Sequence, residues 1–214
     1  MICVSIAEPT FERCMTALGG LEFAEVRLDA MEVEPAQIKR IFSSPLELIA
    51  TCRPGAYDDY LRKVMLLTAI EAGAAYVDVE LDAEPGYREE LFSAARKAGC
   101  EVMVSFHDDK GTPGESELRA VLQRCRDLKP DLVKIACKVN SDRDGARLLG
   151  LLDSTAKLVV VGMGPLGRTV RIAAPLLGSP FTYASLENGK ETADGQMTGD
   201  EMRCIYESMG ARKK

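Results

Sequence analysis

The sequence predicts an α/β protein with a single-domain (β/α)8 barrel over residues 1–214, and two observations favour this fold. Short apolar runs typical of strands alternate with longer amphipathic segments typical of helices, with no linker or low-complexity stretch between them. The alternative, a doubly wound sheet, would open its first helix with a GxGxxG loop, and this chain has no such loop. Eight strand–helix pairs in a chain of this length therefore favour a compact barrel.

Eight runs have the apolar, β-branched composition of strands. They span residues 2–8, 23–29, 47–53, 76–81, 101–108, 132–137, 157–164 and 181–185. The clearest amphipathic segments between them span residues 58–73, 86–99 and 115–128. The first two of these segments end on glycine, which commonly follows the last residue of a helix.

Composition excludes several classes of protein. The net charge of −6 and the scattered Lys and Arg residues, apart from the tail ARKK (211–214), argue against a nucleic-acid-binding surface. No apolar run approaches the ~18 residues of a membrane span, and the N-terminus enters a strand pattern at once, so we expect a cytoplasmic protein. The seven cysteines form no CxxC pair. We expect them to be reduced, small core residues that form neither a disulfide framework nor a zinc site.

Lys134 lies in DLVKIAC, a run that otherwise has the composition of a buried strand. Alternate strand residues face opposite sides, so each predicted strand can be divided into two faces. One face is apolar and suits a helix layer, whereas the other is polar and clusters late in the strand, where a barrel opens into its active site. The polar faces contribute Glu25, Arg27, Arg53, Asp78, Glu80, His107 and Lys134. Glu25 and Arg27 alone would fit a structural ion pair equally well, but seven converging ionisable groups indicate a functional site.

Two members of this set suggest the chemistry. His107 is the only histidine, and it lies at a strand end where it can exchange protons near neutral pH. Burial disfavours the charged form of a lysine, so the neutral amine of Lys134 can attack a carbonyl and form a Schiff base. One histidine without a cysteine cluster does not indicate a metal site. Arg168 and Arg171, in the Gly-rich loop GMGPLGRTVR, could each bind a carboxylate or phosphate.

The motifs EVRLD, ATCRP, VDVEL, SFHD, VKIA, the GMG loop with its arginine, and DGQMT occur in this order. Together they make the chain resemble the type I 3-dehydroquinate dehydratase family over essentially its whole length. The resemblance implies a homodimeric (β/α)8 lyase of the shikimate pathway that converts 3-dehydroquinate to 3-dehydroshikimate and water. It also implies that no metal or organic cofactor is needed.

The resemblance also implies a role for each matching residue. Lys134 would form the imine with the C3 ketone, and His107 would transfer the protons. Arg171, placed by its spacing from Met163 and expected to begin a helix, would bind the substrate carboxylate. The rest of the expected substrate-binding set is Ser5, Glu25, Arg27, Arg53, Thr192 and Gln196, and Asp78 and Glu80 would support it.

The chain departs from the family pattern in the loop after the third predicted strand. Tyr57 stands where the family carries a glutamate that orients the histidine, so Asp58, Asp59 or Glu80 would have to take this role. Two other functions use the same residues: a class I aldolase, which would cleave a carbon–carbon bond, and a barrel that binds a ligand without catalysis. The arginines and Gln196 suit a polyhydroxylated carboxylate better than an aldolase substrate, and simple binding would not need the lysine–histidine pair.

Overall fold

The computed structural model describes residues 1–154 and 157–210. The basic tail ARKK noted above lies outside these residues. The described residues contain all eight predicted strands, which are β1 (Ile2–Ile6), β2 (Phe23–Arg27), β3 (Glu47–Thr51), β4 (Tyr76–Glu80), β5 (Glu101–Asp108), β6 (Leu132–Lys138), β7 (Leu158–Met163) and β8 (Thr182–Ser185). The strand β2 ends before Asp29 and β3 ends before Arg53, so these two residues lie in the connections and not in the strands as predicted.

Helices follow the strands in alternation. They are α1 (Phe11–Ala17), α2 (Pro35–Phe42), α3 (Asp59–Ala72), α4 (Pro85–Ala98), α5 (Glu115–Asp127), α6 (Asp142–Gly150), α7 (Arg168–Leu176) and α8 (Gly199–Ser208), with short 3-10 turns η1 (Leu28–Ala30), η2 (Leu151–Asp153) and η3 (Pro165–Gly167). As predicted, α3 and α4 end at glycines in the left-handed conformation, Gly73 with φ 111° and Gly99 with φ 74°.

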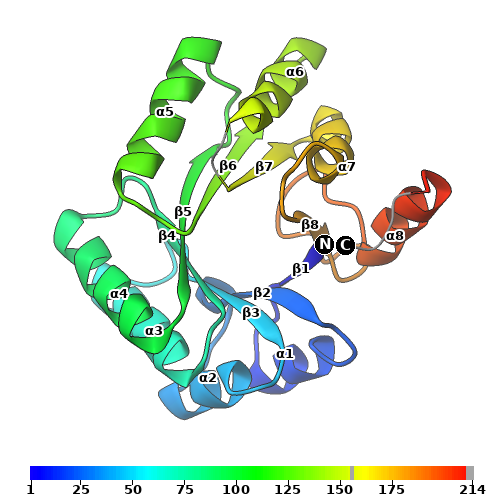
Figure 1. Cartoon of the computed structure of the whole chain (residues 1–214). Coiled ribbons are helices and arrows are strands. Elements are labelled where there is room, and N and C mark those ends of the chain that lie inside the picture. The colour runs from blue at the N-terminus through cyan, green and yellow to red at the C-terminus, as the bar shows by residue number, and fades with distance from the viewer. Residues whose placement is uncertain (155–156, 211–214) are drawn as a thin grey trace. The chain divides into compact units, whose positions relative to one another are not determined.

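The described chain forms two compact units. The N-terminal unit is Val4–Met103, and the C-terminal unit is Met1–Cys3 together with Val104–Lys214. Within the N-terminal unit the parallel strands follow one another in the order β4-β3-β2-β1. On the outer side of these strands α2 packs on α3, and α3 packs on α4 (Figure 1).

The register of the N-terminal unit places polar side chains level with one another. Ser5 pairs with Glu25, and Arg27 pairs with Thr51. The alternate residues Ala24 and Val26 of β2, and Leu48 and Ala50 of β3, which are level with them, are buried. The apolar face of each strand therefore holds the core, and the opposite face carries the polar residues, as the alternation predicts.

In the C-terminal unit β5, β6 and β7 are neighbours in that order, and Lys134 of β6 is level with Val159 of β7. The helices α6 and α7 pack on each other beside β7 (Figure 1). At the start of β8, the Thr182 amide donates to the Met1 carbonyl over 3.1 Å. These contacts hold together β6, which contains Lys134, and the helix α7, which contains Arg171.

Cysteine burial follows the prediction with one exception. Six of the seven free cysteines are buried, but Cys204 on α8 is exposed. Its helix has an amphipathic sequence, and Cys204 falls on the solvent side, so composition alone wrongly assigned it to the core. Among the described residues, no helix is both long and apolar enough to cross a membrane.

Candidate active site

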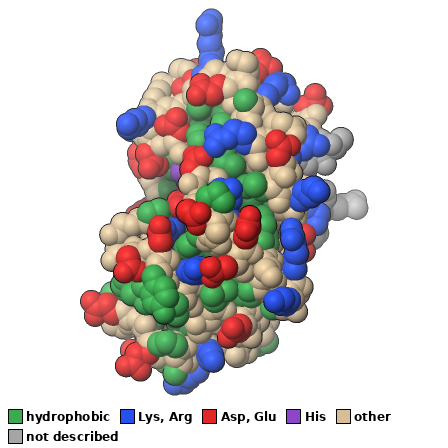
Figure 2. Space-filling view, turned by 90° about the vertical axis from the view of Figure 1, so that its left-hand side faces the viewer, with side chains coloured by type: hydrophobic (Ala, Val, Ile, Leu, Met, Phe, Trp, Pro, Cys, Tyr) green, Lys and Arg blue, Asp and Glu red, His purple; other side chains and the backbone are tan. Residues whose placement is uncertain are grey.

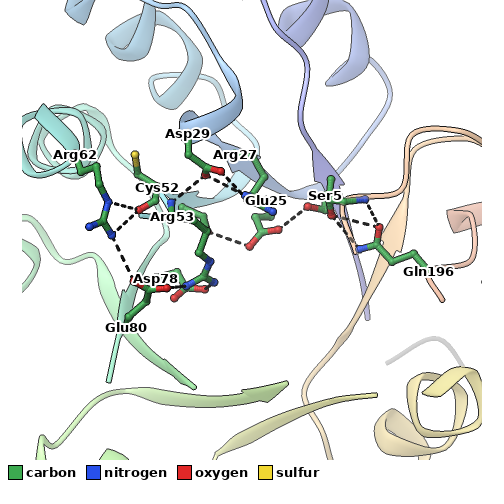
Figure 3. Close-up of polar contacts among 12 residues, drawn as sticks. Ser5, Glu25, Arg27, Asp29, Cys52, Arg53, Arg62, Asp78, Glu80 and Gln196 are labelled. Atoms are coloured by element: carbon green, nitrogen blue, oxygen red, sulfur yellow. Dashed lines mark hydrogen bonds and ion pairs between the residues drawn. The ribbon is translucent and has the colours of Figure 1, made fainter. Parts of the chain in front are cut away.

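Glu25 is held by hydroxyl groups from the strands on either side of it. The Ser5 hydroxyl of β1 donates to one carboxylate oxygen, and the Thr51 hydroxyl of β3 donates to the other over 3.0 Å (Figure 3). All three residues are buried. The two contacts hold the Glu25 carboxylate in one orientation. Sequence analysis did not include Thr51 in the site.

Arg53 joins the carboxylates of β4 to the same cluster. Its Nη2 lies 2.5 Å from Asp78 Oδ2, and its Nη1 lies 3.5 Å from Glu80 Oε1. Burial works against the charged guanidinium, but the nearby Asp78, Glu25 and Glu80 carboxylates outweigh it and raise the pKa of Arg53. The predicted supporting residues Asp78 and Glu80 therefore do contact a predicted substrate-binding arginine.

Arg27 does not form the ion pair with Glu25 that was considered as a structural alternative. Its Nε and Nη2 donate to the two carboxylate oxygens of Asp29 over 3.0 and 2.6 Å (Figure 3). Burial favours protonation of Asp29, but the hydrogen bonds and charge of Arg27 prevail and lower the pKa of this carboxyl. Asp29 also accepts from the Arg53 amide at 3.0 Å. The motif EVRLD contains this residue, yet its role as the partner of Arg27 was missed.

Arg62 is a further residue that sequence analysis missed. This buried arginine of α3 donates from Nε and Nη2 to the Cys52 carbonyl, over 3.0 Å each. Its Nη1 lies 2.6 Å from Asp59, and its Nη2 lies 3.5 Å from Glu80. Arg62 thus secures the chain directly before Arg53. A long cationic side chain in an amphipathic helix is usually on the solvent side, so the sequence carried no signal for this role.

Each of the three carboxylates considered as partners of His107, namely Asp58, Asp59 and Glu80, has a contact within the N-terminal unit. The Asp58 side chain accepts from the Leu61 amide over 2.8 Å and caps α3, and Asp59 and Glu80 both contact Arg62. The Tyr57 hydroxyl donates to the Met31 carbonyl over 2.5 Å. Tyr57 therefore ties this loop to the chain after η1. The orientation of His107 by one of the three carboxylates stays a prediction.

Lys134 is buried in the C-terminal unit, with 5 % of the residue exposed. Its Nζ lies 4.2 Å from the centre of the Tyr183 ring, which β8 contributes. A cation at this distance from an aromatic face is attracted by the ring quadrupole. This contact gives one physical reason why an ammonium group can occupy the middle of an otherwise apolar strand.

His107 is half-buried near the end of β5, and the loop that follows it is fastened to the end of β6. The Thr112 hydroxyl donates to the Lys138 carbonyl over 2.7 Å, and the Asn140 side-chain amide donates to the Lys110 carbonyl over 2.9 Å. Arg147 of α6 donates to the carbonyls of the same loop. The end of β5, which carries the predicted base, is therefore linked to the end of β6, the strand that contains the predicted nucleophile.

Arg171 is fully buried, with 0 % of the residue exposed. Its Nη1 donates to the Tyr183 carbonyl over 3.4 Å, whereas Nε and Nη2 have no hydrogen-bond partner among the described residues. Burial lowers the pKa of Arg171 to about 10, although the charge of Asp194 partly opposes this shift. Two buried donors are thus left without an acceptor, which is the arrangement that a carboxylate can complete.

The helix around Arg171 differs from the expectation. The helix α7 begins at Arg168, so Arg171 is its fourth residue and not its first. Arg168 is exposed at the helix start. The turn directly before α7 packs closely on β7, because a Cβ atom at Gly167 would lie 2.4 Å from the Gly162 carbonyl carbon. The chemistry of the side chains does not distinguish Arg168 from Arg171 as the carboxylate-binding residue, but the structure does, because Arg171 is buried and Arg168 is exposed.

The loop between β8 and α8 carries the last two predicted residues, Thr192 and Gln196. The Gln196 side-chain oxygen accepts from the Thr192 amide over 2.7 Å, so the two lie together. This loop docks on the loop after β7: the Gly164 amide donates to the Asp194 carbonyl over 3.0 Å. Gly195, with φ 78°, is required there, because a Cβ atom would lie 2.1 Å from the Gly164 carbonyl oxygen.

On the molecular face drawn in Figure 2, basic and acidic side chains are interspersed, with no large area of one sign. This mixture on the visible face agrees with a chain whose net charge is only −6.

The chain is similar to known proteins over its whole length. The sequence profile of the type I 3-dehydroquinase family matches residues 2–213. A 3-dehydroquinate dehydratase from Thermococcus gammatolerans is 36 % identical over 198 residues, which cover 91 % of this chain and 91 % of that protein. One from Desulfotalea psychrophila is 32 % identical over 220 residues and covers 96 % of each.

Solved structures confirm the fold. The crystal structure of 3-dehydroquinate dehydratase from Geobacillus kaustophilus HTA426 matches with a TM-score of 0.88 and 19 % identity, covering 100 % of this chain and 92 % of that one. The predicted (β/α)8 barrel, also called a TIM barrel, is therefore confirmed. The predicted enzyme class, a hydro-lyase, is confirmed by the family profile and the relatives. By its sequence profile and its relatives, the chain belongs to the type I 3-dehydroquinase family.

Proposed function

We propose that this protein dehydrates 3-dehydroquinate to 3-dehydroshikimate, a step of the shikimate pathway, through a Schiff base on Lys134. The observation that carries this proposal is the pair of unpartnered donors on Arg171, in the same unit as a buried lysine. A substrate with both a carboxylate and a ketone satisfies both groups. Family membership supports the identity of that substrate.

The proposed reaction begins when the neutral amine of Lys134 attacks the C3 ketone and water leaves, which forms a protonated imine. The imine withdraws electrons and acidifies the C2–H bond, and His107 takes that proton. The electron pair forms the C1=C2 double bond, and the C1 hydroxyl departs as water with a proton from His107. Hydrolysis of the imine then releases the product and the free lysine.

The carboxylate is proposed to bind Arg171, where Nε and Nη2 can donate to its two oxygens. Because Arg171 is fully buried, we propose that the loop carrying Thr192 and Gln196, whose Asp194 acts electrostatically on Arg171, moves to admit the substrate. We assign the ring hydroxyls to the remaining polar groups, with Asp78 and Glu80 holding Arg53 in place. These groups are Ser5, Glu25, Arg27, Arg53, Thr192 and Gln196.

Three further expectations belong to this proposal. The chain is proposed to act as a homodimer in the cytoplasm and to need no metal or organic cofactor. Family resemblance supports the homodimer and the lack of a cofactor, and a biosynthetic role supports the cytoplasmic location. Sedimentation of the purified protein measures the oligomeric state. If no metal is needed, turnover should be unchanged by EDTA.

The test of the proposal mixes the purified protein with 3-dehydroquinate and follows the absorbance of the conjugated product. Borohydride added with substrate should inactivate the enzyme and add the ligand mass to the peptide that contains Lys134. His107→Ala should still be labelled, yet lose about 10²–10⁴-fold in kcat, because it lacks only the proton-transfer group.

The matched control is Lys157→Met, which removes an exposed lysine before β7 and should leave labelling and turnover intact. Labelling at another lysine, or no labelling, would contradict the Schiff-base mechanism. Cleavage of a carbon–carbon bond instead of loss of water would indicate the aldolase alternative. Binding without any product would indicate a ligand-binding barrel.

A further inference from the structure

The ring of Tyr183 has no role in the reaction described so far, although it faces the proposed nucleophile. The distance from Lys134 Nζ to the ring centre is 4.2 Å, well inside the ~6 Å range of a cation–π contact. Both residues are buried, with 5 % of Lys134 and 3 % of Tyr183 exposed. The attraction therefore acts where water screens it little, and such desolvated contacts are the strongest of their kind.

The ring is held in place from two directions. The rings of Phe181 and Tyr183 meet edge to face, with their centres 5.5 Å apart. The backbone carbonyl of Tyr183 accepts a hydrogen bond from Arg171 Nη1. A ring with so little freedom can act on a nearby charge without first being ordered, which is the condition for electrostatic preorganisation.

The charge that the ring faces changes during the proposed reaction. The lysine nitrogen is neutral when it attacks the ketone, and it is cationic again once the protonated imine has formed. Loss of the C2 proton requires that cationic imine, because only the protonated form is a strong electron acceptor. A π-face beside the nitrogen favours this form over the neutral imine and over the neutral amine.

We propose that the ring face of Tyr183 is a further catalytic element, which contacts the reacting nitrogen of Lys134 and stabilises the protonated imine. The inference rests on the proposed Schiff-base function. It assigns the effect to the π-electrons of the ring and not to the hydroxyl group, since the nitrogen lies over the ring, 4.2 Å from its centre.

The experiment replaces Tyr183 by phenylalanine and then by phenylalanines with one, two and three ring fluorines, inserted by an expanded genetic code. Fluorination withdraws electrons from the π-face and changes the shape of the ring little. We expect kcat to fall stepwise along the series, by about 10-fold in total, within the range of a buried cation–π contact. The fraction of enzyme that cyanoborohydride traps with 3-dehydroshikimate should fall in parallel.

Two other variants separate this effect from packing. Tyr183→Leu removes the ring and should lose at least as much kcat as the most fluorinated variant. Phe181→Leu removes the ring that supports Tyr183 but keeps the π-face beside Lys134, so it should lower the melting temperature and reduce the trapped fraction less than Tyr183→Leu does. If Tyr183→Leu does not fold, the fluorinated series alone decides, because its members keep the shape of the side chain.

A flat series, with equal kcat and equal trapping in all variants, would overturn the inference while the Schiff base stands. A large loss already in Tyr183→Phe, with no further loss on fluorination, would also overturn it and assign the effect to the hydroxyl. If the wild-type protein itself is not trapped at Lys134, the proposed function fails and the inference fails with it.

Discussion

Arg53 is mostly buried and Arg171 is fully buried, but the surroundings of these two arginines differ. Arg53 in the N-terminal unit contacts two carboxylates, and its pKa is raised because Asp78, Glu25 and Glu80 outweigh the effect of burial. Arg171 in the C-terminal unit has two donors without a partner among the described residues, and burial lowers its pKa to about 10. The first cation is neutralised by the protein, whereas the second is available to neutralise a ligand.

This difference indicates how each residue should respond to substitution. A buried charge with a partner stabilises the fold only while both members remain, and loss of one member leaves the other uncompensated. A buried charge without a partner lowers stability until a ligand supplies the opposite charge. The same type of side chain therefore has opposite effects on stability in the two units.

The largest expected effect concerns the paired arginine. Asp78→Asn should lower the free energy of unfolding by about 3 kcal/mol, because it leaves the mostly buried Arg53 without its nearest counter-charge. Urea unfolding measures this value. Asp59→Asn is the matched control, since Asp59 is exposed and its contact with Arg62 should contribute less than ~1 kcal/mol. Equal losses in the two variants would contradict the comparison.

The next effect concerns catalysis. Arg171→Ala should lower kcat/KM by at least ~1.5–3 kcal/mol, the value of a hydrogen bond to a charged group, chiefly through a higher KM. Arg168→Ala should cost much less, because Arg168 is exposed at the start of α7. Steady-state kinetics with 3-dehydroquinate measure both. The reverse order in two folded variants would show that Arg168 binds the carboxylate.

The smallest expected effect has the opposite sign to the first. Without ligand, Arg171→Met should raise the free energy of unfolding by about 1 kcal/mol, because it replaces an uncompensated buried cation by an apolar side chain of similar length. Chemical unfolding of the ligand-free protein measures this change. Equal or lower stability of the variant would mean that the guanidinium is already compensated in the free protein.

This stabilisation should also depend on pH. The Arg171 pKa of about 10 lies below the ordinary value of 12.5, so the unfolded chain binds more protons than the folded one between these values. The contribution of Arg171 to the free energy of unfolding of the wild-type protein therefore rises with pH above 10. Below pH 10 this contribution is constant, because Arg171 stays protonated in both the folded and the unfolded state. The advantage of Arg171→Met should be constant from pH 7 to 9 and shrink above pH 10.

Local sequence patterns predicted much of the fold and part of the site. The alternation of polar and apolar residues along each strand depends only on the extended backbone, so it located all eight strands and placed Glu25 and Lys134 on polar faces. The glycines that end α3 and α4 were predictable for a similar reason, because the left-handed conformation there favours glycine. Motif resemblance supplied the family, which the comparisons confirm.

Contacts between elements were decided by the tertiary structure. Arg27 pairs with Asp29, Arg62 of α3 reaches the Cys52 carbonyl, and Tyr183 faces Lys134 from a strand some fifty positions later in the chain. Such contacts depend on strand register and helix packing, which no local periodicity specifies. The sequence by itself determined which residues face the core and which face the polar side, because that choice follows from backbone geometry. Which charges are paired and which await a ligand depends on distances between elements, and only the folded chain determines those distances.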